Sequence, residues 1–205
     1  MLVKNFNNNS YGTNTYIIAC EKSGLAAVID PTGDINEIIY YIKNNNLEVK
    51  YIVLTHGHFD HIGLVLDLKE YSKSLICIHE KDNNMLQDSY LNLSVRFNNP
   101  IQIHSDIELV DDQELLLGKL KLKVIHTPGH TPGSICILTE DYLFSGDTIF
   151  KGTVGRTDLP GGNYDEIINS IKIISGLDKN LIVYPGHGET TTLEAEFINN
   201  PYFKL

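Results

Sequence analysis

The segment Thr55–His61 contains three histidines and one aspartate within six residues, directly after the apolar run Tyr51–Leu54. A short apolar run that ends in such a cluster is typical of a buried strand that stops at a sheet edge. Imidazole and carboxylate together are ligands for zinc, iron or manganese. A catalytic zinc usually takes about three protein ligands and keeps one position open. Four candidate ligands are too many for one small ion, so the segment predicts two adjacent metals.

The length and composition are those of one globular domain. The chain has 205 residues, of which 42% are hydrophobic and 20% charged, enough to bury a core. No linker rich in proline, glycine and serine divides the sequence, so we predict a single domain over residues 1–205. No apolar run approaches the roughly 18 residues of a membrane span, and the N-terminal residues lack the apolar core of a signal peptide. We therefore predict no membrane partner and a cytoplasmic location.

The charge argues against one class of partner. A formal net charge of −10 at pH 7 is unlike a nucleic-acid-binding protein, which needs a concentrated basic surface. The lysines of residues 119–123 alternate with apolar residues, a pattern typical of the solvated face of a strand. The cysteines are odd in number, widely spaced and set in apolar stretches, so we predict that they are reduced and buried. They are Cys20, Cys77 and Cys136.

Alternating strand-like and helix-like segments predict a layered α+β fold. Apolar residues recur with a period near 3.6 over residues 34–44, with Asp34 as the expected N-cap. Similar helical patterns cover residues 62–71, 80–93 and 165–175. Two sheets packed face to face with helices outside account for this order, which indicates two related halves. The strand-like runs are Thr15–Cys20, Ala26–Ile29, Tyr51–Leu54, Leu75–Ile78, Lys119–Ile125, Ser134–Leu138, Tyr142–Ser145 and Leu181–Tyr184.

Three further segments end a strand-like run with a candidate ligand beside glycine or proline. They are residues 126–134 around His130, residues 143–148 around Asp147, and residues 184–189 around His187. Glycine lets the backbone turn tightly at a sheet edge, so that one side chain faces a common centre. Loops at one end of a rigid pair of sheets are a natural place to gather ligands that lie far apart in sequence.

The four ligand-bearing segments, in this order and spacing, resemble the metallo-β-lactamase superfamily and, within it, the glyoxalase II-like (hydroxyacylglutathione hydrolase) branch. The shared signature is T-H-x-H-x-D-H, then a lone histidine, a bridging aspartate and a late G-H-G, and the resemblance covers nearly the whole chain. A single H-x-H is weak evidence, whereas the complete set of seven ligands is specific. The resemblance implies an α+β fold, a four-layer αββα sandwich, with a dinuclear site at the sheet edges.

The resemblance also implies the role of each ligand. Asp147 is expected to bridge the two metals, where a carboxylate offsets part of their repulsion, and Asp60 is expected to help orient the nucleophile. Metal coordination lowers the pKa of water toward about 7. We predict two divalent ions, zinc first, with iron or manganese as alternatives. The remaining ligands are His56, His58 and His130 for one metal, and Asp60, His61 and His187 for the other.

The other three histidines lie outside the ligand motifs. We interpret His79 and His104 as surface or packing residues. His126 stands four residues before His130, and we favour a structural role for it. The alternative is that His126 orients a ligand histidine through a hydrogen bond.

Two features of the sequence bear on the substrate. Glyoxalase II enzymes hydrolyse thioesters of glutathione, and they hold this thiol carrier with a basic residue after the bridging aspartate and with a C-terminal helical domain. Arg156 matches the basic residue and is a candidate for binding a substrate carboxylate. The alternative is that Arg156 pins its loop through an ion pair with Asp158 or Glu166. Only 18 residues follow His187, so the chain resembles the short forms without the helical domain.

The expected activity is dinuclear metal-dependent hydrolysis of a small anionic thioester. The alternative is a persulfide dioxygenase of the same fold, which binds one iron through equivalents of His56, His130 and Asp147. The loop Leu159–Gly162 and the complete second-metal set favour the hydrolase. A β-lactamase is disfavoured because His61 and Asp147 occur together and no export signal is seen. The oligomeric state stays open, with a homo-oligomer as one alternative.

Overall fold

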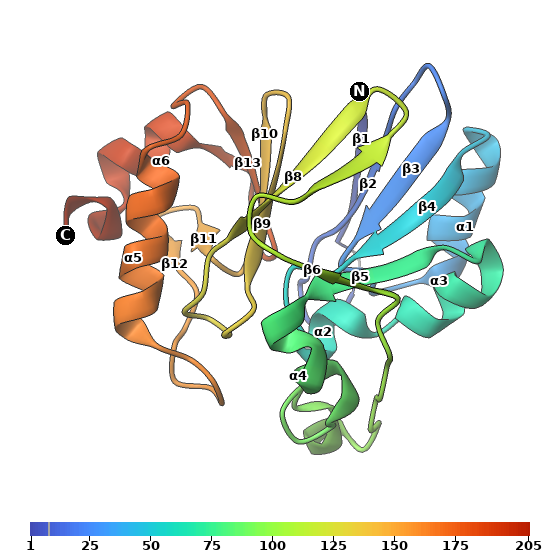
Figure 1. Ribbon diagram of the computed structural model, residues 1–205, viewed down its shortest axis with the longest axis horizontal. Helices are drawn as coiled ribbons and strands as arrows, with labels where there is room; N and C mark the ends of the chain where they lie inside the picture. Colours follow the sequence, from blue (N-terminus) through green and yellow to red (C-terminus); the bar gives the residue numbers. More distant parts are fainter. Residues whose placement is uncertain (8) are drawn as a thin grey trace.

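Two six-stranded sheets packed face to face form the centre of the molecule (Figure 1). A computed structural model describes residues 1–7 and 9–205. The first sheet contains, in spatial order, β1 (Leu2–Phe6), β2 (Thr15–Ala19), β3 (Leu25–Ile29), β4 (Glu48–Val53), β5 (Leu75–His79) and β6 (Ile107–Leu109). The second contains β14 (Thr191–Thr192), β13 (Ile182–Pro185), β10 (Tyr142–Gly146), β9 (Ile135–Thr139), β8 (Leu120–His126) and β7 (Glu114–Leu117). A small hairpin joins β11 (Ile149–Phe150) and β12 (Thr153–Val154).

Each sheet combines parallel and antiparallel pairs. In the first sheet β1, β2 and β3 pair antiparallel, whereas β3 to β6 pair parallel. In the second sheet β10 and β13 are parallel neighbours, and the other pairs are antiparallel. Parallel strands end at the same edge of a sheet. The loops after β3, β4, β10 and β13 therefore reach a common region where the two sheets meet.

Helices cover the outer face of each sheet. The first sheet carries α1 (Ile35–Asn44) and α3 (Val65–Ser72), and the second carries α5 (Tyr164–Ser175) and α6 (Leu193–Asn199). Figure 1 shows the resulting order of four layers, with α1 and α3 at one side and α5 and α6 at the other. Five short helices lie in the connections: α2 (Phe59–Ile62), α4 (Asn83–Gln87), η1 (Glu80–Asp82), η2 (Ser94–Phe97) and η3 (Pro201–Lys204).

Alternating side chains along the strands separate three apolar cores. In β2, Tyr16 and Ile18 face the second sheet, whereas Ile17 and Ala19 pack beneath α1 and α3. Between the sheets, Phe144 of β10 lies at 5.2 Å from the ring of Tyr16, measured between ring centroids. A third core joins the outer face of the second sheet to α5 and α6. Because side chains alternate along each strand, one set faces the space between the two sheets and the other set faces the outer helices.

The structure confirms the predicted α+β fold and its four-layer αββα arrangement. It also confirms the N-cap of α1, because Asp34 accepts a hydrogen bond from the backbone N–H of Asn36 at 2.8 Å. The three cysteines are buried and free, as expected. The prediction of one helix over residues 80–93 is wrong. That segment forms η1 and α4 and then leaves helical geometry at Asp88, whose backbone is extended.

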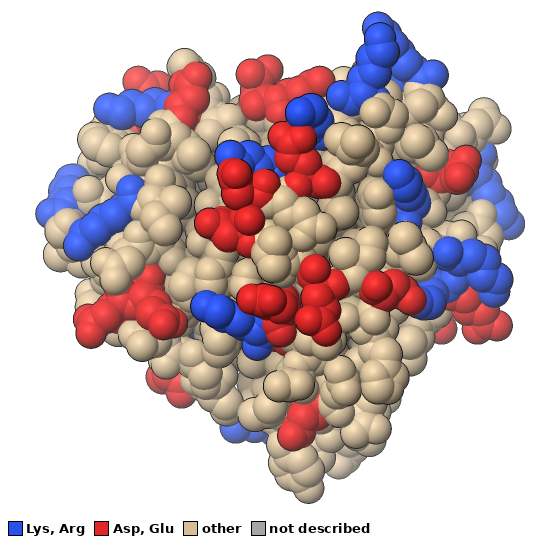
Figure 2. All heavy atoms as spheres, in the orientation of Figure 1, with Lys and Arg blue, Asp and Glu red and all other residues tan. Residues whose placement is uncertain are grey.

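The surface agrees with the acidic composition. On the face drawn in Figure 2, acidic and basic side chains of the described residues are interspersed, and the acidic ones gather near its middle. No helix among residues 1–7 and 9–205 is long and apolar enough to cross a membrane.

Replacing Phe144 by alanine tests the packing between the sheets. The ring is fully buried and stacks on Tyr184 at 5.1 Å between centroids. Its loss leaves a cavity between two rigid sheets, so we expect the free energy of unfolding to fall by about 3–5 kcal/mol. Urea unfolding of the metal-free protein measures this. The control is Tyr90→Ala, because Tyr90 is 73% exposed. Equal losses in both variants would contradict the assignment of Phe144 to the core.

Candidate metal centre

The seven predicted ligands come from four segments and meet at one edge of the sandwich. His56 and His58 follow β4, and the adjoining α2 carries the next two ligands, Asp60 and His61. His130 lies in the loop between β8 and β9. The last two follow the parallel neighbours β10 and β13 and are Asp147 and His187. The loops are joined across the sheets, since the N–H of Ile135 donates to the carbonyl of Thr55 at 2.9 Å.

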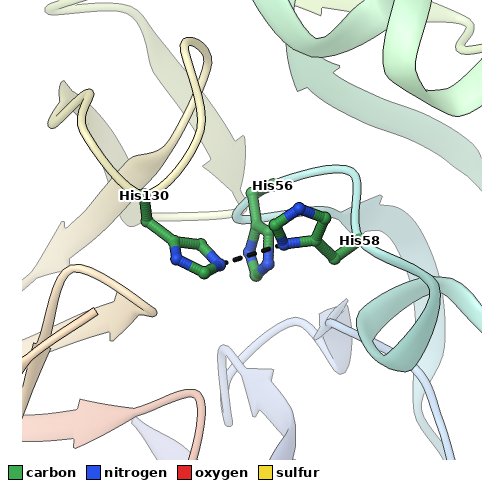
Figure 3. Close-up of side chains that lie close together, drawn as sticks. All are labelled: His56, His58 and His130. Atoms are coloured by element: carbon green, nitrogen blue, oxygen red, sulfur yellow. Dashed lines mark hydrogen bonds between the residues drawn. The ribbon is translucent and has the colours of Figure 1, made fainter. Parts of the chain in front are cut away.

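The first group consists of His56, His58 and His130, all of which are buried. One ligand atom from each lies within 4.8 Å of the others. Figure 3 shows the three rings pointing toward one another, with His56 and His58 on one loop and His130 on the facing loop. Nδ1 of His58 and Nε2 of His130 are 3.0 Å apart. Nδ1 of His130 donates to the carbonyl of Arg156 at 2.8 Å in the neutral ring, so its Nε2 carries the lone pair.

The second group consists of Asp60, His61 and His187, whose ligand atoms also lie within 4.8 Å of one another. The Nε2 atoms of His61 and His187 are 3.2 Å apart. Oδ2 of Asp60 lies 3.3 Å from Nε2 of His187 and 3.7 Å from Nε2 of His61. This group is less enclosed than the first, because Asp60 and His187 are half-buried.

Asp147 lies between the two groups. Its Oδ1 atom is 3.4 Å from Nε2 of His61. Its Oδ2 atom is 3.5 Å from Nε2 of His130 and 3.6 Å from Nε2 of His187. The carboxylate thus faces a member of each group, which is the placement that a bridging ligand needs.

The donor set fits two metal ions. Nε2 of His56, Nε2 of His58 and Oδ1 of Asp147 are buried and have no hydrogen-bond partner within the described part of the chain. Buried polar atoms are costly to leave unpaired. Imidazole nitrogens that lie about 3 Å apart are also close enough to bind one metal ion, since Zn–N bonds are about 2.0–2.1 Å long. Metal ions bound to Nε2 of His56, Oδ1 of Asp147 and one nitrogen of His58 account for these features.

Burial and neighbouring charge set the protonation states of the site. Burial lowers the pKa of His58 to about 3, with a further contribution from the nearby His130. Burial and the neighbouring His61 also hold the pKa of His56 well below its ordinary value. Both rings are therefore neutral, the form that binds a metal. Burial opposes protonation of His61 as well, but nearby carboxylates, first that of Asp147, outweigh it and raise the pKa to about 10. These carboxylates therefore favour positive charge at that point, which a metal ion bound to the neutral ring of His61 would supply.

Asp30 anchors the second group and was not among the residues predicted from the sequence. It is fully buried at the end of β3. Its Oδ2 atom is 2.9 Å from Nδ1 of His61, and its carboxylate accepts hydrogen bonds from the N–H and the hydroxyl of Thr55 at 2.8 and 2.6 Å. This fixes the tautomer of His61 that presents Nε2 to the centre. The signal in the sequence was a carboxylate followed by proline directly after an apolar run.

Asp82 connects the two loops that supply the first group. It is buried at the end of η1 and accepts from the N–H of Gly57 at 3.1 Å, between His56 and His58. On the other loop it accepts from the hydroxyl of Thr131 at 2.7 Å and from the N–H of Gly133 at 2.6 Å. Asp82 was not predicted from the sequence, because it lay within the helix expected over residues 80–93.

One glycine of the last ligand motif is required by close contact. A Cβ atom on Gly186 would collide with Oδ1 of Asp147 and would lie 2.9 Å from Cε1 of His61. The G-H-G motif therefore brings the backbone beside His187 against two other ligands, an approach that only glycine permits.

A cavity of about 520 Å³ opens over the ligands. Its wall is largely apolar and aromatic, and it also includes Arg156. The guanidinium of Arg156 forms a two-pronged ion pair with Asp158, with both N–O distances at 2.7 Å. This ion pair is the loop-pinning contact that we considered as the alternative to substrate binding. The other expected partner of Arg156, Glu166, lies in the first turn of α5.

The remaining histidines lie outside the two ligand groups. The rings of His79 and His126 stack at 4.1 Å between centroids, and Nε2 of His126 lies 2.9 Å from the carbonyl of Pro132. His126 thereby supports the loop that carries His130, in line with the structural role that we favour. His104 is exposed and is not part of the candidate site.

Comparisons with known proteins identify relatives of the whole chain. The model of the metallo-beta-lactamase superfamily matches residues 9–187. A probable metallo-hydrolase, YqgX of Bacillus subtilis, is 35% identical over 92% of this chain and 91% of that protein. The hydroxyacylglutathione hydrolase GloC of Haemophilus influenzae is 36% identical over 86% of each.

Solved structures show the same similarity. A B3 metallo-beta-lactamase, BLEG-1, has a TM-score of 0.93 at 35% identity and covers 100% of both chains. A di-iron-bound form of TTHA1623 has a TM-score of 0.85 at 28% identity, over 97% of this chain and 99% of that one. ETHE1 from Myxococcus xanthus has a TM-score of 0.84 at 26% identity, over 98% and 84%.

Replacing Asp147 by alanine tests the bridging position. The variant removes the carboxylate that faces both groups, so we expect the metal content to fall from about two ions per chain to less than one. Metal analysis by mass spectrometry after dialysis measures this. The control is Asp67→Ala, which removes an exposed carboxylate from the first turn of α3. Two bound ions in Asp147→Ala would exclude the bridging role.

Replacing Asp82 by alanine tests the connection between the ligand loops. The change leaves the N–H groups of Gly57 and Gly133 without their acceptor. We expect the protein to lose at least about 2 kcal/mol of stability and its metal affinity to fall about 10- to 100-fold. Urea unfolding and competition with a chromophoric chelator measure the two effects. An unchanged metal affinity would show that Asp82 stabilises the fold without positioning the ligands.

Proposed function

Because the chain belongs to the metallo-beta-lactamase superfamily and is a metal-dependent hydrolase by its relatives, we propose that it hydrolyses a thioester in the manner of hydroxyacylglutathione hydrolases. The observation that carries the proposal is the placement of Asp147 between two complete groups of candidate ligands. We assign the seven ligands to two divalent ions, with zinc as the first candidate. The relative GloC, named for this activity, supports the thioester as substrate.

Two ions held by these side chains would polarise the substrate carbonyl and lower the pKa of a water molecule for attack. Asp60 stands at the open side of the second group, 18% exposed, where it can accept a hydrogen bond from the attacking water and orient it. The wall of the cavity is largely apolar, which suits the carbon and sulfur atoms of a thioester. Asp30 keeps His61 in one orientation throughout, since its carboxylate is held by Thr55.

A persulfide dioxygenase is the second candidate, and the similarity to ETHE1 is the observation that favours it. A single iron would need only His56, His130 and Asp147. This chain also retains the full second group, and Asp30 is positioned to orient His61 within it. The retention of the second group together with its support favours two metals. The di-iron-bound structure of TTHA1623 keeps iron as a candidate for both positions.

A thioester panel, with metal analysis of protein purified without added metal, tests the proposal. We expect about two ions per chain and release of free thiol from an S-lactoyl thioester, followed with a thiol reagent. One iron per chain, with oxygen consumed on a persulfide, would replace the hydrolase by the dioxygenase. A chromogenic β-lactam is included because the structurally similar BLEG-1 is a B3 metallo-beta-lactamase. If the protein cleaved the β-lactam and none of the thioesters, thioester hydrolysis would be rejected as its function.

A further inference from the structure

The two arginines of the chain line the same cavity. The sequence contains only Arg96 and Arg156, and both stand in the wall of the cavity over the ligands. Among the described residues, no lysine lines this cavity, although lysines make up most of the basic residues. Arginine presents a planar fork of donors that matches a carboxylate, whereas lysine offers a point charge. The positive groups at this cavity therefore suit a planar anion.

The two guanidinium groups differ in their partners. Arg156 is neutralised by its two-pronged ion pair with Asp158. Within residues 1–7 and 9–205, the Arg96 side chain has neither a salt bridge nor a hydrogen bond, although the net charge of the chain is −10. Arg96 thus retains its full set of donors for a ligand.

The backbone holds Arg96 in a defined place. Arg96 lies in η2, which is flanked by Leu93 at φ 69°, in the left-handed region that most side chains disfavour, and by Asn98 at φ 55°, a residue type that tolerates this region. The segment is tied down by the fully buried Asn92, whose side chain donates to the carbonyl of Ile101 at 2.9 Å and accepts from the N–H of Ser94 at 3.0 Å. A strained backbone that persists beside a reactive centre points to a functional demand.

The same segment is joined directly to the ligand helix. The N–H of Phe59, which follows His58, donates to the carbonyl of Asn92 at 2.9 Å. The ring of Phe97 stacks on that of Phe59 with centroids 4.1 Å apart and planes at 21°. Phe97 nevertheless remains 50% exposed. An apolar surface of two rings therefore lies between the ligands and the rim that carries Arg96.

We propose that Arg96 is a specificity-determining residue that binds a carboxylate on the thiol part of the substrate. This rests on the proposed thioester hydrolysis. The scissile carbonyl lies over the ligands, and the sulfur and its methylene pack on Phe59 and Phe97, since sulfur makes favourable contacts with aromatic rings. The carboxylate beyond them reaches the fork of Arg96. The substrate class is an acyl thioester of a small carboxylate-bearing thiol, such as a cysteine derivative or a short peptide.

A matched pair of substrates isolates the carboxylate. The S-lactoyl thioesters of N-acetylcysteine and N-acetylcysteamine differ only in that group. We expect the wild-type protein to favour the first by about tenfold or more in kcat/KM. In Arg96→Ala, kcat/KM for the N-acetylcysteine thioester falls by a similar factor, mainly through KM, whereas the other thioester changes by less than about twofold. Arg96→Lys restores part of the preference, because it keeps the charge and loses the fork.

The control variant is Lys172→Ala, which removes one positive charge from the exposed face of α5 and should leave the substrate preference unchanged. Equal kcat/KM values for the two thioesters in the wild-type protein, or an equal loss on both in Arg96→Ala, would overturn the role of Arg96. Binding of S-methyl-N-acetylcysteine, measured by calorimetry, requires no turnover. If neither thioester is cleaved, the proposed function fails, and binding still decides the role of Arg96: loss of binding in Arg96→Ala supports it and unchanged binding rejects it.

Discussion

The buried carboxylate of Asp30 is the interaction on which the arrangement of the site depends. It stands at the end of β3 and holds both the backbone and the hydroxyl of Thr55 at the end of the neighbouring parallel strand. The carbonyl of Thr55 in turn accepts from Ile135 of the second sheet. One carboxylate thereby links two strands of the first sheet, the junction with the second sheet, and the ring of His61. This network of hydrogen bonds places the ligand cluster that follows β4.

The sequence predicts those strands and helices whose apolar residues follow a regular pattern. Short apolar runs located eight strands of the two sheets, and the 3.6-residue period located α1 and α5. Four strands were missed, because they lie at the sheet edges and are short or mix polar with apolar residues: β1, β6, β7 and β14. The segment predicted as one helix over residues 80–93 forms η1 and α4 and becomes extended at Asp88. Tertiary hydrogen bonds engage carbonyls of this segment, since Leu86 accepts from the N–H of Ile103 and Asn92 from that of Phe59.

The candidate ligands were predictable for a different reason. Histidine, aspartate and glycine at strand ends have a local signature, and the parallel pairing of β10 with β13 explains why segments far apart in sequence reach one edge. The residues that support the ligands carry no such signature. Asp30 and Asp82 are single carboxylates whose partners are fixed only by the packing of the sheets. Arg96 lies in an aperiodic loop, so its position beside the ligands follows from the fold and not from a motif.

The candidate ligands and much of the cavity wall lie on different parts of the fold. The candidate ligands lie in α2 and in the loops that follow β4, β8, β10 and β13, at one edge of the two sheets. The cavity wall is built from connections, namely η2, the hairpin of β11 and β12, and the loop that carries Arg156. Connections tolerate change without loss of the core. Among the described residues of this wall, the basic side chain without an ion-pair partner is Arg96, which stands on a connection and not on a sheet.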